Sequence, residues 1–88
     1  MQKTIYSRES RLLHELLKEI RVARGLTQED VARRTRMRQS DLSKVETGVR
    51  RLDFVELRHL LIALDFDMKT FVDEFEARLP GGGLFWKP

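Results

Sequence analysis

Two short helical segments joined by a tight turn constrain this chain more than any other feature. The first segment follows Thr27, a favoured N-cap residue, and Asp30 three positions later completes a pair that resembles a capping box. The stretch 35–38 has room only for a tight turn. The second helix is expected over about 39–47, and it ends where Gly48 permits a left-handed backbone. The pattern predicts a helix-turn-helix motif over about 27–48.

Several positions of this motif are restricted together. Ala32 is small where the two helices would cross closely, and Met37 can fill the wedge between them after the turn. Leu42 and Val45 close that wedge with i, i+3 spacing. The opposite face of the second helix carries the hydrogen-bonding residues Gln39, Ser40, Ser43 and Lys44. Such a helix fits the DNA major groove, where each base pair presents its own donor and acceptor pattern.

The segment resembles the Cro/repressor (Xre-like) helix-turn-helix regulators, the family of the phage lambda repressor. The resemblance covers roughly residues 13–75 and implies an all-α, compact five-helix, lambda-repressor-like DNA-binding domain. It is carried by Leu26-Thr27-Gln28-Glu29, Val31-Ala32, Gln39-Ser40, Leu42-Ser43-Lys44, Glu46 and Gly48. One position departs from the family pattern, because Arg36 stands where a glycine with positive φ is usual. Arginine in that conformation would cost about 1 kcal/mol, so the turn is either strained or reshaped.

Composition excludes several other classes of protein. The 88 residues make one small domain, and the absence of cysteine excludes disulfides and thiolate metal sites. No apolar run approaches the roughly 18 residues of a membrane span, and no signal-peptide pattern is present, so we expect a cytoplasmic protein. The two histidines lie near no evident carboxylate–serine constellation, and no glycine loop suits a phosphate. We therefore expect no enzyme, no cofactor, no metal and no small-molecule ligand, and we place His14 at the surface.

Charge is unevenly distributed along the chain. Residues 33–51 hold seven basic and two acidic residues, a net charge of +5, whereas residues 52–79 hold three basic and seven acidic residues, a net charge of −4. A run of charge is by itself most often a solvated surface. Here the basic run coincides with the helix-turn-helix, which favours an anionic partner.

Three further helices are expected around the motif. The first starts after Ser7 and stops at Gly25, the fourth starts after Asp53, and the fifth covers about 68–79. Their predicted buried stripes are Leu13, Leu16, Leu17, Ile20 and Ala23, then Phe54, Leu57, Leu61 and Leu64, then Phe71, Val72, Phe75 and Leu79. Off the stripe of the fourth helix lie Val55, Leu60 and Ile62. A helix that is apolar over much of its circumference is usually central to its domain, or it could bury its second side against another subunit.

The chain therefore divides into an N-terminal arm over 1–7, the domain over 8–79 and a flexible C-terminal tail over 80–88. The tail carries Leu84-Phe85-Trp86 behind a glycine tether. The sequence leaves open whether this apolar segment is disordered or docks in a groove.

The expected DNA contacts fall into two groups. Base contacts are expected from Gln39, Ser40, Ser43, Lys44 and Arg38, and phosphate contacts from Thr27, Gln28, Thr47, Arg50 and Arg51. The amide of Gln39 can donate to adenine N7 while it accepts from adenine N6. The family resemblance implies that Gln28 binds a phosphate and braces Gln39. Glu46 is expected to pair with an arginine of the same chain, and Asp41 either accepts from cytosine or braces Arg38.

These observations lead to two interpretations. The leading one is a sequence-specific regulator that binds double-stranded DNA, most simply a repressor that binds a palindromic operator as a homodimer. Dimers of this kind place their recognition helices about 34 Å apart, one turn of B-DNA. The alternative is a protein-interaction module on a helix-turn-helix fold, antitoxin-like or a transcriptional adaptor, which would suit the acidic C-terminal half.

Overall fold

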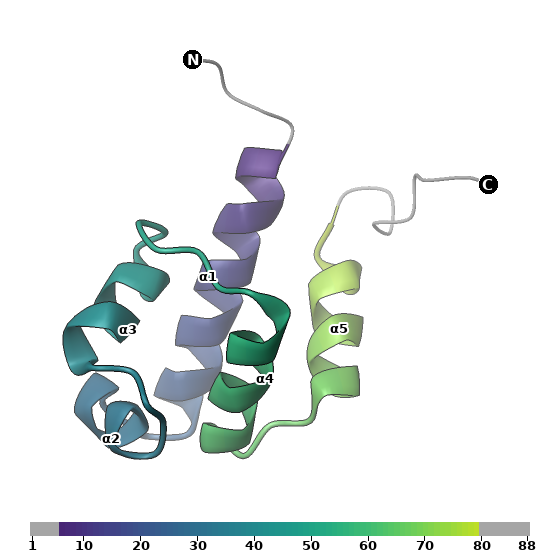
Figure 1. Cartoon of the computed structure of the whole chain (residues 1–88). Helices are drawn as coiled ribbons and strands as arrows, with labels where there is room; N and C mark the ends of the chain where they lie inside the picture. Colours follow the sequence, from purple (N-terminus) through teal and green to yellow (C-terminus); the bar gives the residue numbers. More distant parts are fainter. Residues whose placement is uncertain (1–5, 80–88) are drawn as a thin grey trace.

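Five α-helices make up the computed structural model, which describes residues 6–79 and side chains from Arg8 onward (Figure 1). They are α1 Tyr6–Ala23, α2 Gln28–Arg33, α3 Gln39–Glu46, α4 Phe54–Ala63 and α5 Met68–Ala77. No strand occurs within this range, which confirms the all-α prediction and the expected order of helices. The segments 1–5 and 80–88, with most of the predicted arm and the Leu84–Trp86 tail, lie outside the described residues.

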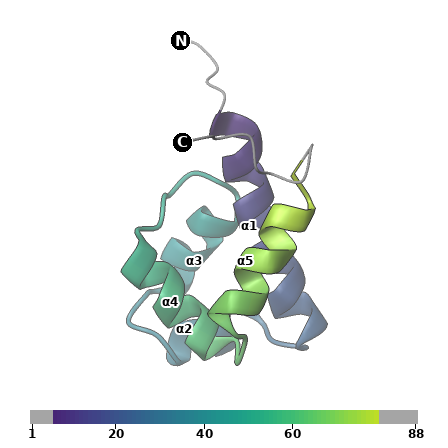
Figure 2. The same ribbon diagram turned by 90° about the vertical axis from the view of Figure 1, so that its right-hand side faces the viewer.

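The long helix α1 organises the packing. It contacts α3 on one side and α5 on another, and α2 packs against α3 (Figures 1 and 2). The side chains that meet between these helices form one core: Leu16, Leu17, Ile20, Val31, Leu42, Val45, Leu60, Leu61, Ala63, Leu64 and Phe71. Burial of each large apolar side chain contributes about 1.5–3 kcal/mol, so this core is the main stabilising element.

The buried stripe of α4 differs from the predicted one. Leu60, predicted to lie off the stripe, is only 2 % exposed, whereas Phe54, predicted to lie on it, is 67 % exposed. Leu57 is half-buried, so the stripe consists of Leu57, Leu60, Leu61 and Leu64. Because α4 is apolar around most of its circumference, periodicity could not decide which side faces the core. Val55 and Ile62 remain about 60 % exposed, as expected for residues off the stripe.

Smaller differences concern helix ends. Ser7 lies inside α1 and is therefore not its N-cap, and Ala23 at its last turn is exposed rather than buried. Helix α5 ends at Ala77, yet Leu79 beyond it is still buried. Gly25 adopts the left-handed conformation expected of a helix stop, with φ of 73°.

Side-chain caps define the starts of three helices. The hydroxyl oxygen of Thr27 accepts a hydrogen bond from the Asp30 N–H at 3.0 Å, and the Asp30 carboxylate accepts from the Thr27 N–H at 2.8 Å. The hydrogen bond from the Thr27 N–H to the carboxylate is the main cause that lowers the pKa of Asp30. Asp53 forms the same reciprocal pair with Glu56 at the start of α4, whereas Asp67 caps α5 only by accepting from the Thr70 N–H. The predicted capping box of α2 is confirmed.

The turn of the motif is reshaped rather than strained at Arg36. Asp65 is the only non-glycine residue with positive φ among the described residues, so Arg36 does not adopt the left-handed conformation. The Thr35 hydroxyl accepts from the Met37 N–H at 3.0 Å and lies 3.3 Å from the Ala32 carbonyl oxygen. The threonine side chain thus closes the turn without the family's glycine.

The prediction of a surface position for His14 is wrong. The residue is 4 % exposed, and its Nε2 lies 3.3 Å from the Ser10 hydroxyl oxygen. Its Nδ1 has no hydrogen-bond partner, and burial lowers the pKa of the ring. The imidazole fits under Gly48, where a Cβ atom would lie 3.4 Å from its Cδ2. A Cβ at this position would therefore just touch the ring, and the φ of 82° is the reason that Gly48 must be glycine.

No helix among the described residues combines the length and the apolar character needed to cross a bilayer.

Candidate nucleic-acid interface

The two glutamines of the motif are joined by a hydrogen bond. Gln39, the first residue of α3, donates from Nε2 to Oε1 of Gln28, the first residue of α2, at 2.6 Å. Gln28 in turn donates from its Nε2 to Oε1 of Glu46 at 3.0 Å. The start of α2, the start of α3 and the end of α3 are thus linked by side chains. The bracing of Gln39 by Gln28 is present in the folded chain.

A buried ion pair anchors this chain of hydrogen bonds. Arg21 of α1 donates from Nε to Oε2 of Glu46 at 2.6 Å and from Nη2 to Oε1 at 3.0 Å. Its Nη1 donates to the Leu26 carbonyl oxygen at 2.7 Å. The two charged side chains are 12 % and 4 % exposed. The expectation that Glu46 pairs with an arginine is confirmed, and bidentate geometry makes such pairs strong and directional.

Arg21 was missed at the sequence level. It follows Ile20 of the apolar stripe and looks like any basic residue in the last turn of a helix. The sequence feature that could have pointed to Arg21 is Glu46, because an acidic residue within a basic segment indicates an ion pair with an arginine or lysine.

The predicted base-contacting residues lie together on α3 and just before it. Gln39, Ser40, Lys44 and Arg38 are exposed, whereas Ser43 is half-buried. Oδ2 of Asp41 accepts from Nε of Arg38 at 3.5 Å, so the expected contact between Asp41 and Arg38 is present in the folded chain. An exposed polar edge of α3 is therefore available to a partner.

The predicted phosphate-contacting residues are partly engaged within the chain. The hydroxyl oxygen of Thr27 caps α2, and the hydroxyl of Thr47 donates back to the carbonyl oxygens of Ser43 and Lys44 at 3.1 and 3.2 Å. Arg51 is exposed and forms no ion pair with any residue that the structure describes.

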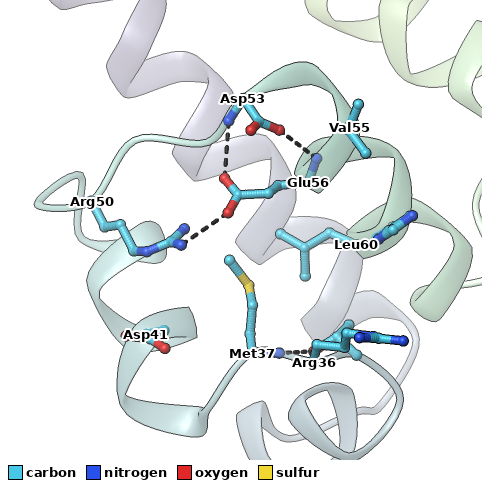
Figure 3. Close-up of a pocket in the computed structure, with 10 residues that line it drawn as sticks. Arg36, Met37, Asp41, Arg50, Asp53, Val55, Glu56 and Leu60 are labelled. Atoms are coloured by element: carbon cyan, nitrogen blue, oxygen red, sulfur yellow. Dashed lines mark hydrogen bonds and ion pairs between the residues drawn. The ribbon is translucent and has the colours of Figure 1, made fainter.

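Arg50, expected to contact phosphate, is bound within the chain by a carboxylate. Its Nη2 donates to Oε2 of Glu56 at 2.9 Å, at the rim of a pocket of about 320 Å³ (Figure 3). Met37 and Leu60 give this pocket an apolar interior between the turn and α4. The hydrogen bond from Arg50 lowers the pKa of Glu56, which also accepts from the Asp53 N–H at 3.1 Å. The pair ties the segment after α3 to the first turn of α4.

Within residues 6–79, no group of three or more His, Cys, Asp and Glu residues is arranged to hold a metal ion. The surface described above offers hydrogen-bond donors and positive charge.

Comparison with known proteins agrees with this geometry. A family model described as a helix-turn-helix domain matches residues 13–71. The crystal structure of the wild-type restriction-modification controller protein C.Esp1396I is similar, with a TM-score of 0.75 and 25 % sequence identity over 78 % of this chain and 91 % of that one. The crystal structure of the C.Esp1396I tetramer in complex with its natural 35 base-pair operator matches with the same TM-score, identity and coverage.

No protein of curated function matches the sequence. The family match covers most of the described residues and includes both helices of the motif together with α4. The chain therefore belongs to the helix-turn-helix domain family, as its resemblance to the Cro/repressor-type regulators predicted.

Proposed function

We propose that this chain is a transcriptional regulator that binds double-stranded DNA in a sequence-specific way through α3. The observation that carries the proposal is the exposed edge of α3, where Gln39 is fixed by Gln28 at 2.6 Å. A side-chain amide that is already held in one orientation loses little conformational entropy when it binds a base. It also presents its donor and acceptor in one fixed order, which favours one base over the others. The similarity to a controller protein crystallised with its operator supports the same use of the fold.

The proposed contacts divide by chemistry. Gln39, Ser40, Lys44, Ser43 and Arg38 face base edges, with Gln39 suited to adenine. Thr27, Gln28, Thr47, Arg50 and Arg51 hold phosphates on either side and fix the register. The backbone N–H groups at the start of α2 add partial positive charge at the Thr27–Gln28 end.

A homodimer on a palindromic operator is the simplest form of this proposal, and repression by blocking a promoter is its simplest effect. One domain of this size makes few contacts, and two recognition helices one turn of DNA apart double them. Val55 and Ile62 share one face of α4 and are about 60 % exposed, which suits a subunit interface.

The oligomeric state can be measured directly. Analytical ultracentrifugation at tens of micromolar protein is expected to show a dimer, and Ile62→Glu is expected to give a monomer. Val22→Glu is the matched control, because Val22 is equally exposed but lies on α1. A wild-type monomer, with and without DNA, would contradict the dimer.

Selection of bound sites from random DNA tests the central proposal. We expect enrichment of one short motif and binding that weakens steeply as salt is raised, because phosphate contacts release counterions. Enrichment of no motif would contradict sequence-specific binding.

The second candidate function is a protein-interaction module, antitoxin-like or a transcriptional adaptor. It is favoured by the acidic segment 52–79 and by the exposed apolar residues of α4. Mainly apolar partner binding would depend weakly on salt, so the same titration separates the two functions. In either case we propose a non-enzymatic protein without a cofactor, and a DNA-binding regulator would act in the cytoplasm at the nucleoid.

A further inference from the structure

We infer that Glu46, although buried beneath the reading surface, determines which base Gln39 recognises, because it sets the direction of the hydrogen bonds that run from α1 to the start of α3. The inference rests on the proposed function and deepens it. It makes Glu46 a positioning residue that acts on specificity through Gln28 and Gln39.

The carboxylate of Glu46 can only accept hydrogen bonds. A carboxylate has no proton to donate, and both oxygens of Glu46 are already bound by Arg21 at 2.6 and 3.0 Å. The amide of Gln28 faces Oε1 of the same carboxylate at 3.0 Å. Only the nitrogen end of that amide can make this contact. The orientation of Gln28 therefore follows from the chemistry of Glu46.

The fixed orientation of the Gln28 amide also fixes the orientation of Gln39. With its nitrogen on Glu46, Gln28 presents Oε1 to α3, and this oxygen requires a donor. Gln39 supplies that donor from Nε2 at 2.6 Å. One N–H of Gln39 is thereby used inside the protein, while its Oε1 and second N–H remain for a ligand. An acceptor beside a donor, in a fixed order along α3, is the pattern that complements N6 and N7 of adenine.

The anchor itself cannot turn. Arg21 holds Glu46 with two hydrogen bonds and holds the Leu26 carbonyl oxygen with a third at 2.7 Å. The Glu46 side chain is 4 % exposed, so water does not compete for its oxygens. Rigid, buried polar partners of this kind specify one arrangement of the groups that they contact.

Replacing the carboxylate by an amide removes the fixed order. In Glu46→Gln, one of the two Arg21 donors meets an N–H₂ group whichever way the new amide turns, because Arg21 donates to both oxygens of Glu46. The atom that faces Gln28 can therefore be the oxygen or the nitrogen, so Gln28 and Gln39 adopt both orders. The donor and the acceptor on the outer edge of Gln39 then no longer keep fixed places, and the preference for adenine relaxes.

The test compares base preference in three proteins. Wild type, Glu46→Gln and the control Glu19→Gln are assayed on the selected site and on variants at the base pair whose preference Gln39→Ala abolishes. Glu19 pairs with Arg78, the C-cap residue of α5, at 2.9 Å and not with a residue of the motif. We expect Glu46→Gln to lose about tenfold in relative affinity for the preferred base at that pair, with other pairs unchanged.

A purely structural role predicts something else. It would lower the affinity for all sequences by one common factor and keep the preference at that base pair. This result would overturn the inference, as would preferences in Glu46→Gln that match those of Glu19→Gln.

A second variant and a DNA-free measurement keep the test decisive if Glu46→Gln folds poorly. Gln28→Leu leaves the Arg21–Glu46 pair intact and removes only the hydrogen bonds that connect Glu46 to Gln39, so preference at the same base pair is expected to relax.

In the free protein, the side-chain ¹⁵N resonance of Gln39 is expected to shift in both variants and not in Glu19→Gln. An unchanged resonance would overturn the inference while DNA binding stood. A shifted resonance in a protein that selects no DNA motif would overturn the proposed function, and with it the role in base choice.

Discussion

The guanidinium of Arg50 lies 2.9 Å from the carboxylate of Glu56, so an arginine of the basic run is oriented by the first turn of α4 (Figure 3). Glu56 also accepts from the Asp53 N–H that opens this helix. One carboxylate therefore joins the cap of α4 to the segment that follows the recognition helix. The charges of Arg50 and Glu56 partly cancel. The ion pair therefore weakens the electrostatic attraction between this segment and DNA unless a phosphate displaces Glu56 from the guanidinium.

Arg50→Ala is expected to weaken binding to all DNA sequences by a similar factor, because a phosphate contact carries no base information. The slope of log affinity against log salt is expected to flatten by about 0.9 for the one lost contact. Fluorescence anisotropy with specific and scrambled duplexes at several salt concentrations measures both effects. Lys69→Ala on α5 removes one charge away from the motif, and an equal slope in the two variants would contradict the contact.

Gln39→Ala is expected to lower affinity for the selected site by about 1–3 kcal/mol and to relax preference at one base pair. The physical reason is the loss of the paired donor and acceptor that Gln28 holds in place. Competition binding with single-base variants of the site gives the result. Preference that stays intact at every base pair would show that the edge of α3 is not read through this residue.

Thr27→Ala is expected to destabilise the fold by about 1 kcal/mol through loss of the α2 cap and also to weaken DNA binding. Asp67→Ala is the matched variant, because Asp67 caps α5 by accepting from the Thr70 N–H at 3.0 Å. Urea unfolding should show a similar loss of stability in both proteins. Only the Thr27 variant should bind DNA less tightly than its stability explains, and equal binding by the two would argue against a phosphate contact at Thr27.

His14 is expected to make stability depend on pH. Burial lowers the pKa of its ring below 6.5, so below that pH the unfolded chain binds a proton that the folded chain resists. The free energy of unfolding should be constant above about pH 6.5 and fall below it by at most about 1.4 kcal/mol per pH unit. Urea unfolding between about pH 7.5 and about pH 5.5 measures this loss.

Two histidine variants separate the source of that pH dependence. His14→Gln should remove the fall, whereas His59→Gln should keep it because His59 is exposed on α4. A fall of equal size in both variants would assign the effect to other groups.

Local chemistry in the sequence predicted much of the fold. Thr27 with Asp30, and Asp53 with Glu56, are capping pairs whose partners stand three residues apart, so their hydrogen bonds form whenever the helix forms. Gly25 and Gly48 mark helix ends because both adopt positive φ. The resemblance to the Cro/repressor-type regulators implied that Gln28 braces Gln39, and the two side chains are hydrogen-bonded in the folded chain.

Contacts between residues far apart in the chain were decided only by the tertiary structure. Arg21 meets Glu46 across 25 positions, and His14 fits beneath Gly48, because α1 packs against α3 at one angle and depth that no local pattern contains. The choice of Leu60 over Phe54 for the core of α4 has the same origin, since a helix apolar on nearly every side takes its buried face from its neighbours. The sequence by itself determined where α2 to α5 start and where α1 and α3 stop, because caps and glycines act locally. Packing decided which polar groups are buried and, through them, how Gln39 is held.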